Sequence, residues 1–267
     1  MLNPADIEKY RREGFLTLPG VLPHRFLDEL DQAIFEPIAR QALHVLGKGF
    51  SSQTPMIERQ MLMEKLKELA PERYLSALKA SQLDPQILAS AAHPVLLEIL
   101  KALGLKHPMV SLKPYPIVIA PNLFFEDGYN IRPAHQEWPV MQGSHNSVVI
   151  WFPLHDLEAD HSSIEMYPGS HLHGVLPYEV SRCGSKVKDD ALSISPVRQS
   201  LARGDLIVFS SFTVHRSSPE GNSLRAAMSI RYNDLLDDSF IERAYPDTTT
   251  YTITRKALDL LSHEFSG

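Results

Sequence analysis

The chain has 267 residues, of which 43% are hydrophobic and 22% are charged, enough for one large domain with a real core or two small ones. Its net charge of -6 argues against nucleic acid as the main partner, and no run of 18 apolar residues predicts a membrane span. The single cysteine, Cys183, excludes an internal disulfide and a cysteine-rich zinc site. The charged N-terminus lacks the apolar centre of a secretory signal, so we expect a cytoplasmic protein.

The first hundred residues predict helices and one short strand. Asn3 and Pro4 are typical of a helix start and Gly14 of its end, and the following "FLTLPGVLP" is typical of a short strand and a turn. A longer helix is expected from His24, because apolar residues recur near helical spacing until Gly47. Shorter helices are expected at about residues 56–70, 72–82 and 94–103.

From about residue 109 the sequence becomes typical of β structure. Short apolar runs are separated by Pro, Gly, Asn and Asp, namely "PMVSLKPYPIVIAPNLFF", "NSVVIWFPL", "SSIEMYPGS", "DLIVFSS" and "LRAAMSIRYND". Few helices of crossover length separate them, which favours an antiparallel sandwich or barrel with the helices against one face. We expect one domain over residues 1–267, with a helical part to about 105, a β core at about 106–235 and an extension at about 236–267.

The stretch "AHQEWP" places two metal-ligand side chains, His135 and Glu137, two positions apart. In an extended backbone both point to the same face, where they can bind one ion. His215 follows the strand-like run "DLIVFSS" and supplies a second imidazole. Two histidines and a carboxylate match the facial triad that binds non-heme Fe(II) with open positions, whereas a structural zinc site needs four protein ligands. His135, Glu137 and His215 are called the triad below.

Two arginines downstream of the triad are candidates for binding an anion. Arg225 opens the predicted strand after His215, and its planar guanidinium fits a carboxylate bidentately. A dicarboxylate that chelates the metal at one end would therefore pair with Arg225 at the other. In a regular strand Arg231 points to the same face as Arg225. The alternative for both is a salt bridge at the surface.

The order of these motifs resembles the phytanoyl-CoA dioxygenase family of Fe(II)/2-oxoglutarate oxygenases. The opening "IEKYRREGFLTLPGVLP" is similar to the family's N-terminal helix and strand. The segments "HQE", "VVIWFPLHDLEADHSSIEMYPGSHLHG" and "VHRSSPEGNSLRAAMSIRY" follow its order of metal dyad, tryptophan strand, PGSH turn, distal histidine and arginine. The resemblance covers most of residues 7 to 235. It implies a mainly β fold, a double-stranded β-helix or cupin-like jelly roll, buttressed by N-terminal helices.

Transferred residue by residue, the resemblance implies that the triad binds iron and that Arg225 holds the distal carboxylate of 2-oxoglutarate. Trp151 and Ser217 match residues that line the cosubstrate pocket, and Gln136 matches a family position whose role is open. Residues Tyr167 to His171, "YPGSH", match a structural turn and not a metal ligand. The implied cofactors are Fe(II), 2-oxoglutarate and dioxygen.

The implied activity is that of a dioxygenase that hydroxylates, or otherwise oxidises, a small-molecule metabolite. One departure is that Glu137 stands where the family usually has aspartate, which lengthens the side chain by one carbon–carbon bond, about 1.5 Å. This change leaves open an inactive jelly-roll binding protein. A third possibility is a cupin-type metal-dependent isomerase or hydrolase, in which Arg225 has no assigned task.

The substrate is expected to be a small polar or anionic molecule rather than a long-chain lipid. The expectation rests on polar residues near the proposed iron, because an apolar substrate would leave such groups unpaired at a cost of roughly 1–3 kcal/mol each. They are Arg231, Gln142, His145 and Asn146. The alternative is that these side chains lie at a solvated rim.

Overall fold

The computed structural model describes residues 2–125, 132–157, 163–181, 184–218 and 223–246. Cys183 lies outside the described residues. So does most of the predicted C-terminal extension, whose described part contains the short helix α8 (Asp238–Glu242).

The expected N-terminal helices are present. α1 (Pro4–Glu13) begins at Asn3, whose side chain accepts a hydrogen bond from the backbone of Asp6, and ends at Gly14. α2 (His24–Leu46) ends at Gly47, as the apolar spacing predicts. The remaining helices of this part are α3 (Met56–Leu69), α4 (Pro71–Ser81) and α6 (Pro94–Ala102), together with α5 (Pro85–Ala89) and the 3-10 turn η1 (Ser90–Ala92), which were not predicted.

Each predicted β run contains a strand. These strands are β1 (Phe15–Leu18), β2 (Pro108–Ile119), β3 (Val148–Pro153), β4 (Ile164–Met166), β8 (Leu206–Ser210) and β10 (Arg225–Asp234). Four more strands were not predicted: β5 (Tyr178–Ser181), β6 (Gly184–Val187), β7 (Val197–Arg198) and β9 (His215–Ser217). Short helical turns complete the fold: η2 (Pro121–Leu123), α7 (Trp138–Met141) and η3 (Ser170–His173).

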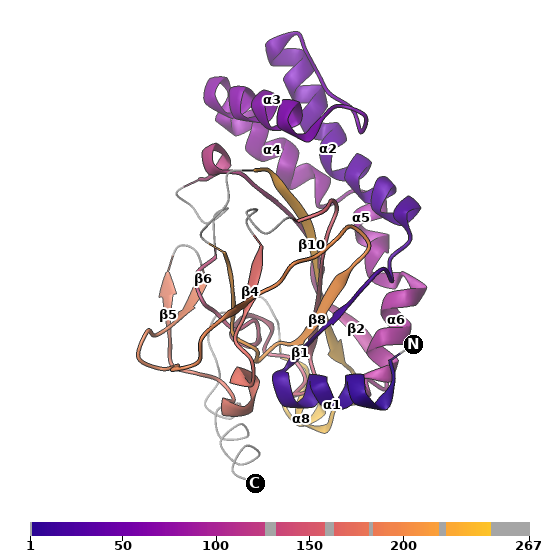
Figure 1. Cartoon of the computed structure of the whole chain (residues 1–267), viewed down its shortest axis with the longest axis vertical. Helices are drawn as coiled ribbons and strands as arrows, with labels where there is room; N and C mark the ends of the chain where they lie inside the picture. Colours follow the sequence, from indigo (N-terminus) through magenta and orange to yellow (C-terminus); the bar gives the residue numbers. More distant parts are fainter. Residues whose placement is uncertain (1, 126–131, 158–162, 182–183, 219–222, 247–267) are drawn as a thin grey trace.

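The strands form the antiparallel sheets of a jelly roll. One sheet has the order β1-β8-β3-β10-β2 and a second has the order β7-β4-β9, while β5 and β6 form a hairpin. Helices α2, α5 and α6 lie on one side of the larger sheet, and the smaller sheet and the hairpin lie on the other (Figure 1). The predicted fold class is therefore confirmed, and the interior of the jelly roll lies between the two sheets.

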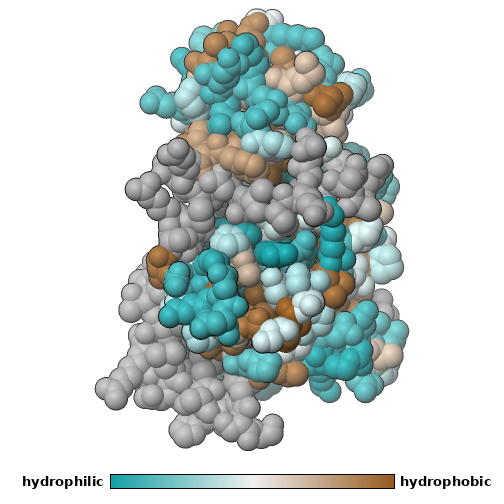
Figure 2. Space-filling model, turned by 60° about the vertical axis from the view of Figure 1, so that its left-hand side comes forward, coloured by the Kyte–Doolittle hydropathy of each residue, from teal (hydrophilic) through white to brown (hydrophobic). Residues whose placement is uncertain are grey.

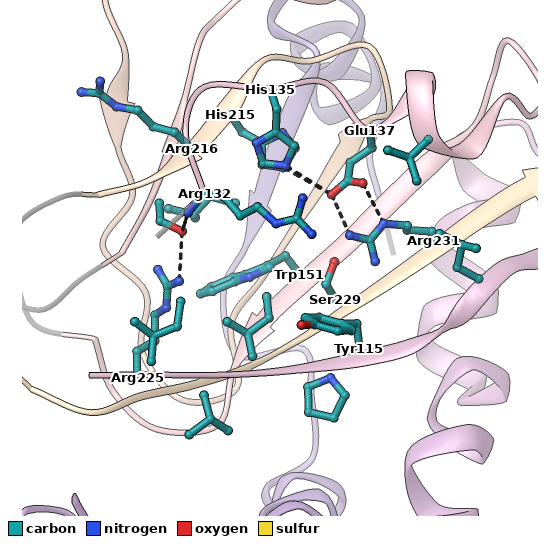
Figure 3. A pocket seen from close by; sticks show the side chains of 18 of the residues that line it. Tyr115, Arg132, His135, Glu137, Trp151, His215, Arg216, Arg225, Ser229 and Arg231 are labelled. Atoms are coloured by element: carbon teal, nitrogen blue, oxygen red, sulfur yellow. Dashed lines mark hydrogen bonds and ion pairs between the residues drawn. The ribbon is translucent and has the colours of Figure 1, made fainter. Parts of the chain in front are cut away.

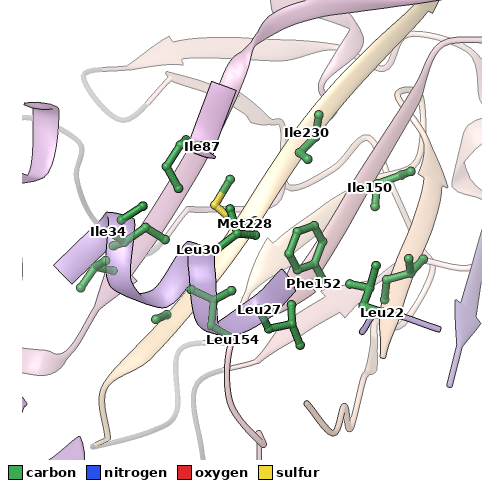
Figure 4. Close-up of a cluster of buried hydrophobic side chains, with 14 of the residues drawn as sticks. Leu22, Leu27, Leu30, Ile34, Ile87, Ile150, Phe152, Leu154, Met228 and Ile230 are labelled. Atoms are coloured by element: carbon green, nitrogen blue, oxygen red, sulfur yellow. The ribbon is translucent and has the colours of Figure 1, made fainter. Parts of the chain in front are cut away.

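The central strands β3 and β10 are buried on both faces. Met228 and Ile230 of β10 pack with Leu30 and Ile34 of α2 in the large core between sheet and helices (Figure 4). Trp151 of β3 belongs to a second apolar cluster between the sheets, with Val149, Ile207 and Phe209. Burial on both faces explains why "VVIWFP" is apolar throughout and does not alternate with polar residues.

On the face seen in Figure 2, hydrophilic and apolar residues are interspersed. Exposed apolar side chains include Ile57, Met61 and Leu69 of α3. No helix in the described part of the chain is long and apolar enough to cross a membrane.

The end of α1 is tied to the loop that carries the distal histidine of the triad. The carbonyl of Gly14 accepts a hydrogen bond from Thr213 Oγ1 at 2.7 Å. The imidazole of His171, in the predicted "YPGSH" turn, lies 3.0 Å from the carbonyl of Arg11. Gly14 has a φ of +80°, and a Cβ added there would lie 2.6 Å from Thr213 Oγ1 and still closer to the His171 ring. A side chain at residue 14 would therefore push the loop away from α1.

We expect Gly14→Ala to destabilise the protein by more than the ~1–2 kcal/mol that a left-handed alanine costs. The additional loss comes from the overlap with Thr213 and His171. Gly47→Ala is the matched control, because Gly47 also ends a helix at a φ of +70° but has nothing within 4 Å of an added Cβ. Urea unfolding of both variants measures the difference. Equal losses would show that the contact between α1 and the loop is not tight.

Candidate metal centre

His135 and His215 face each other because their backbones pair. They form an isolated antiparallel bridge, in which the N–H of each residue donates to the carbonyl of the other at 2.9 and 3.0 Å. Both side chains are buried, and their ring centroids lie 4.2 Å apart. The bridge brings together two segments that are distant in the sequence and directs both imidazoles into the space between the sheets (Figure 3).

Glu137 joins the histidines without the extended backbone that was expected for it. It has helical backbone angles, with φ -82° and ψ -27°, and directly precedes α7. Its N–H donates to the carbonyl of Ser211 at 2.9 Å, which fixes the start of this turn. The prediction of an extended residue was wrong here, although the side chains converge. Oε1 of Glu137 lies 3.6 Å from Nε2 of His135 and 3.6 Å from Nε2 of His215.

The second ring nitrogen of each histidine faces a backbone carbonyl. Nδ1 of His135 lies 2.7 Å from the oxygen of Pro133, and Nδ1 of His215 lies 3.1 Å from that of Thr213. Because a carbonyl only accepts, Nδ1 carries the proton in both rings and each Nε2 presents a lone pair to the centre of the triad. Burial, followed by the charge of His215, lowers the pKa of His135 to about 4 and keeps it neutral. Neutral imidazoles with a carboxylate suit a divalent first-row metal.

The guanidinium of Arg231 pairs with the carboxylate of Glu137. Its Nε donates to Oε2 at 2.9 Å and its Nη2 to Oε1 at 2.8 Å (Figure 3). Burial by itself raises the pKa of Glu137. The charge of Arg231, together with its hydrogen bonds to the carboxylate, outweighs burial and holds this pKa well below its ordinary value. Glu137 is therefore ionised and ready to bind a cation.

The triad lies in a cavity of about 280 Å³ on the inner side of the larger sheet. Strand β10 supplies Arg225, Ser229 and Arg231, because every second residue of this strand faces the interior. The prediction that Arg225 and Arg231 share a face is thus confirmed. Apolar wall residues include Ile117, Ile119, Val140, Trp151, Ile164 and Phe209. The other polar or charged wall residues include Lys113, Tyr115, Arg132, Arg216 and Ser217.

Arg225 lies in the same cavity as the triad, with Trp151 between them (Figure 3). It is 2% exposed, and its Nη1 donates to the carbonyl of Ser163 at 2.9 Å while its Nη2 donates to Oγ of Ser217 at 3.2 Å. The guanidinium carbon lies 5.9 Å from the centre of the Trp151 ring. Burial lowers the pKa of Arg225 to about 10, so the side chain remains protonated at neutral pH. A buried cation with an aromatic neighbour is suited to hold an anion that enters the cavity.

Gln136 has a structural environment and does not line the cavity. Its Nε2 donates to the carbonyls of Gly174 at 2.7 Å and Phe212 at 2.6 Å, and its Oε1 accepts from the N–H of Leu176 at 2.8 Å. The side chain therefore joins two backbone segments, one at Gly174 to Leu176 and one at Phe212. These contacts give no support to a direct role for Gln136 in cofactor binding.

Three residues proposed to contact the substrate also lie outside the cavity wall. Asn146 donates from Nδ2 to Asp234 at 3.0 Å, and the ring of His145 packs edge-on against Phe212. Gln142 is buried with a φ of +45° at the end of α7, where its carbonyl accepts a hydrogen bond from Arg243 at 2.7 Å. Of the four candidates, Arg231 alone lines the cavity with the triad.

Several wall residues were not identified from the sequence. Arg132 reaches the cavity from the segment before the metal dyad, and Tyr115 and Ser229 meet there because β2 pairs with β10. The sequence offered two weak signals for them. Arg132 is a basic residue close to His135, and Ser229 follows the alternation of residues in β10. The pairing of β2 with β10 joins residues too far apart in the chain for either signal to be decisive.

We expect His135→Ala and His215→Ala each to weaken binding of Fe(II) sharply, because a triad has no spare ligand. Anaerobic calorimetry with Fe(II), or with Mn(II) as an oxygen-stable substitute, measures the affinity. His44→Ala is the matched control, since His44 is exposed on α2. Wild-type affinity in both triad variants would remove these residues from the metal site.

The same titration distinguishes the role of Glu137. Glu137→Asp keeps a carboxylate and should retain measurable binding, whereas Glu137→Ala should bind far more weakly. Equal affinities of the two variants would show that Glu137 is not a ligand.

Comparisons with known proteins agree with this site and fold. The family model for phytanoyl-CoA dioxygenase (PhyH) matches residues 10–227, and a search of curated proteins finds no match. The apo structure of the non-heme monooxygenase ThoJ gives a TM-score of 0.54 at 19% identity, covering 85% of this chain and 76% of that one. EvdO2 from Micromonospora carbonacea var. aurantiaca, solved with 2-oxoglutarate, gives 0.53 at 19% identity over 87% and 91%.

A third solved structure is the epimerase SnoN in complex with Fe3+, alpha-ketoglutarate and nogalamycin RO. It gives a TM-score of 0.53 at 17% identity, covering 87% of this chain and 85% of that one. At such identities the three structures show the shared fold. The family model spans the triad and Arg225, and it covers well over half of the sequence. The chain therefore belongs to the phytanoyl-CoA dioxygenase family of Fe(II)- and 2-oxoglutarate-dependent oxygenases.

Proposed function

We propose that the protein oxidises a small, anionic molecule with iron held by the triad and 2-oxoglutarate anchored by Arg225. The observation that carries this proposal is the presence of both features in one cavity, with Trp151 between them. A metal-dependent hydrolase would need the triad but would give no task to a buried arginine. The proposal includes one catalytic domain over residues 1–267, as the sequence predicts.

The triad has the properties that an iron site needs. Its three ligand atoms lie within 4.8 Å of one another and are buried, and both histidines are fixed in the tautomer that leaves Nε2 as the donor. Three ligands from one side leave the other positions of an octahedral ion for cosubstrate and dioxygen. When bound, the iron would supply the oxidising chemistry, in which dioxygen is consumed and 2-oxoglutarate is converted to succinate and carbon dioxide.

The protein's own part is to orient the reactants and to exclude water. Ser163 and Ser217 hold the guanidinium of Arg225 in one orientation. A planar guanidinium held in this way is suited to pair with a carboxylate through two parallel hydrogen bonds. Apolar side chains such as Ile164 and Phe209 line the space around the triad. Inside such an apolar cavity a contact between charges is stronger than in water. The cavity wall would also hold a C–H bond of the substrate next to the metal.

The charges of the cavity wall support an anionic substrate. Among the wall residues in the described part of the chain, Glu137 is the one acidic residue, and Arg231 pairs with it. The basic wall residues are Lys113, Arg132, Arg216, Arg225 and Arg231. Arg216 pairs with Glu165 at 2.6 Å. Of the basic wall residues, we propose that Arg132 contacts the substrate, because it lies near the triad. Arg132 lies close enough to the triad that its charge helps to lower the pKa of His135, after burial and His215.

The proposed cofactor use is tested by adding Fe(II) and 2-oxoglutarate to the protein without oxygen. A weak visible charge-transfer band should appear only when both are present. Binding of 2-oxoglutarate without oxygen consumption would favour the inactive binding protein. Activity that is indifferent to 2-oxoglutarate would favour the isomerase or hydrolase.

We expect Arg225→Ala to raise the 2-oxoglutarate concentration needed for half-maximal charge transfer far more than the Fe(II) requirement. The loss should be on the order of 2–5 kcal/mol, the cost of removing one partner of a buried charge pair. Arg225→Lys should also be impaired, because a point charge cannot replace a planar fork. Arg40→Ala, at an exposed position of α2, is the control. An unchanged 2-oxoglutarate requirement in both Arg225 variants would place the anchor elsewhere.

We also expect acidic metabolites to stimulate succinate formation at least tenfold more than their neutral amides, because the neutral form lacks a partner for Arg132. In Arg132→Ala the KM for the acid should rise, while the KM for 2-oxoglutarate stays within about twofold of wild type. A screen of acid and amide pairs measures both. Equal stimulation by the two forms would contradict an anionic substrate.

A further inference from the structure

The two oxygens of Glu137 have different surroundings. Oε1 faces both imidazoles, at 3.6 Å from each Nε2, and also accepts from Nη2 of Arg231. Oε2 accepts from Nε of Arg231 at 2.9 Å. The carboxylate is therefore turned so that one oxygen points to the centre of the triad and the other is held on the side of Arg231 (Figure 3).

We propose that Arg231 is a positioning residue that limits Glu137 to a single ligating oxygen, Oε1. The inference rests on the proposed function in so far as the triad binds a metal. A carboxylate can bind a metal through one oxygen or through both. If Oε2 also bound, it would occupy a position that cosubstrate or dioxygen needs. The hydrogen bond from Nε of Arg231 competes for Oε2 and keeps this position open.

A glutamate in the triad needs this restraint on its second oxygen. Glutamate has one more rotatable bond than aspartate, so its carboxylate reaches further and turns more freely about the end of the chain. A shorter aspartate at this position would withdraw its carboxylate by about 1.5 Å, away from Arg231. The longer acid and the arginine therefore form a matched pair.

Arg231 itself is held firmly enough to act as a guide. It lies in β10, where its backbone pairs with Val149 of β3 on one side and with Leu112 of β2 on the other. The side chains of Arg231 and Glu137 are only 12% and 7% exposed. Two hydrogen bonds between buried charges fix the carboxylate in both position and rotation.

The test compares Arg231→Ala with the wild type in two backgrounds, Glu137 and Glu137→Asp. The protein is loaded with Mn(II), and its crystal structure shows which oxygens of residue 137 contact the metal. In the Glu137 background we expect Oε1 alone in the wild type and both oxygens in Arg231→Ala. Calorimetry should show Mn(II) affinity within about tenfold of wild type, and 2-oxoglutarate affinity of the Mn(II) protein lowered at least tenfold.

In the Glu137→Asp background, Arg231→Ala should change 2-oxoglutarate affinity less than twofold, because the shorter acid no longer meets the arginine. Arg231→Lys, which has one donor group, should fall between wild type and Arg231→Ala and guards against a folding defect in the alanine variant. A single metal-bound oxygen in Arg231→Ala would overturn the inference, as would equal losses in the two backgrounds.

The two proposals fail in different ways. If the wild type binds Mn(II) but not 2-oxoglutarate, the proposed function is wrong, while the number of metal-bound oxygens in the two structures still decides the role of Arg231. If the wild type binds no metal at the triad, both proposals are overturned.

Discussion

The site depends on one short backbone pairing, the antiparallel bridge between His135 and His215. Two hydrogen bonds join a segment that precedes α7 to the start of β9, and they bring two imidazoles together with their ring planes tilted by 48°. Because the backbone is fixed in this way, the carbonyls of Pro133 and Thr213 fall next to the Nδ1 atoms and select the tautomer of both rings. The metal-binding geometry thus follows from main-chain contacts that position and orient the two imidazoles.

Strand β10 connects this site to the stability of the whole fold. Its even-numbered residues, such as Met228 and Ile230, pack in the core against the helices, whereas Arg225, Ser229 and Arg231 line the cavity. A shift of this strand by one residue would exchange the two sets and place arginines in an apolar core. The cost of that exchange fixes the register, so Arg225 and Arg231 are held where a flexible loop could not hold them.

The fold and the centre of the site could be predicted from the sequence because their signals are local. The order of motifs resembles that of a family with a jelly-roll fold, and this resemblance indicated that the triad and Arg225 would meet. The partners of Arg231, Gln136 and Asn146 could not be predicted. Arg231 and Asn146 bind acids some 90 positions away in the sequence, and Gln136 binds backbone groups of two separate loops. Such contacts exist only after the sheets have closed.

The pair of Glu137 and Arg231 also changes the electrostatics of the cavity. With the two side chains neutralising each other, the ligand set contributes no net charge, and a divalent ion at the triad would keep its full charge. Arg225 adds one positive charge, so a dianionic cosubstrate would leave the filled site positive by about one unit. A neutral substrate would leave the excess uncompensated in a largely apolar cavity, whereas an anion would cancel it. On these grounds we propose that the arginine that orients the metal ligand also favours a negatively charged substrate.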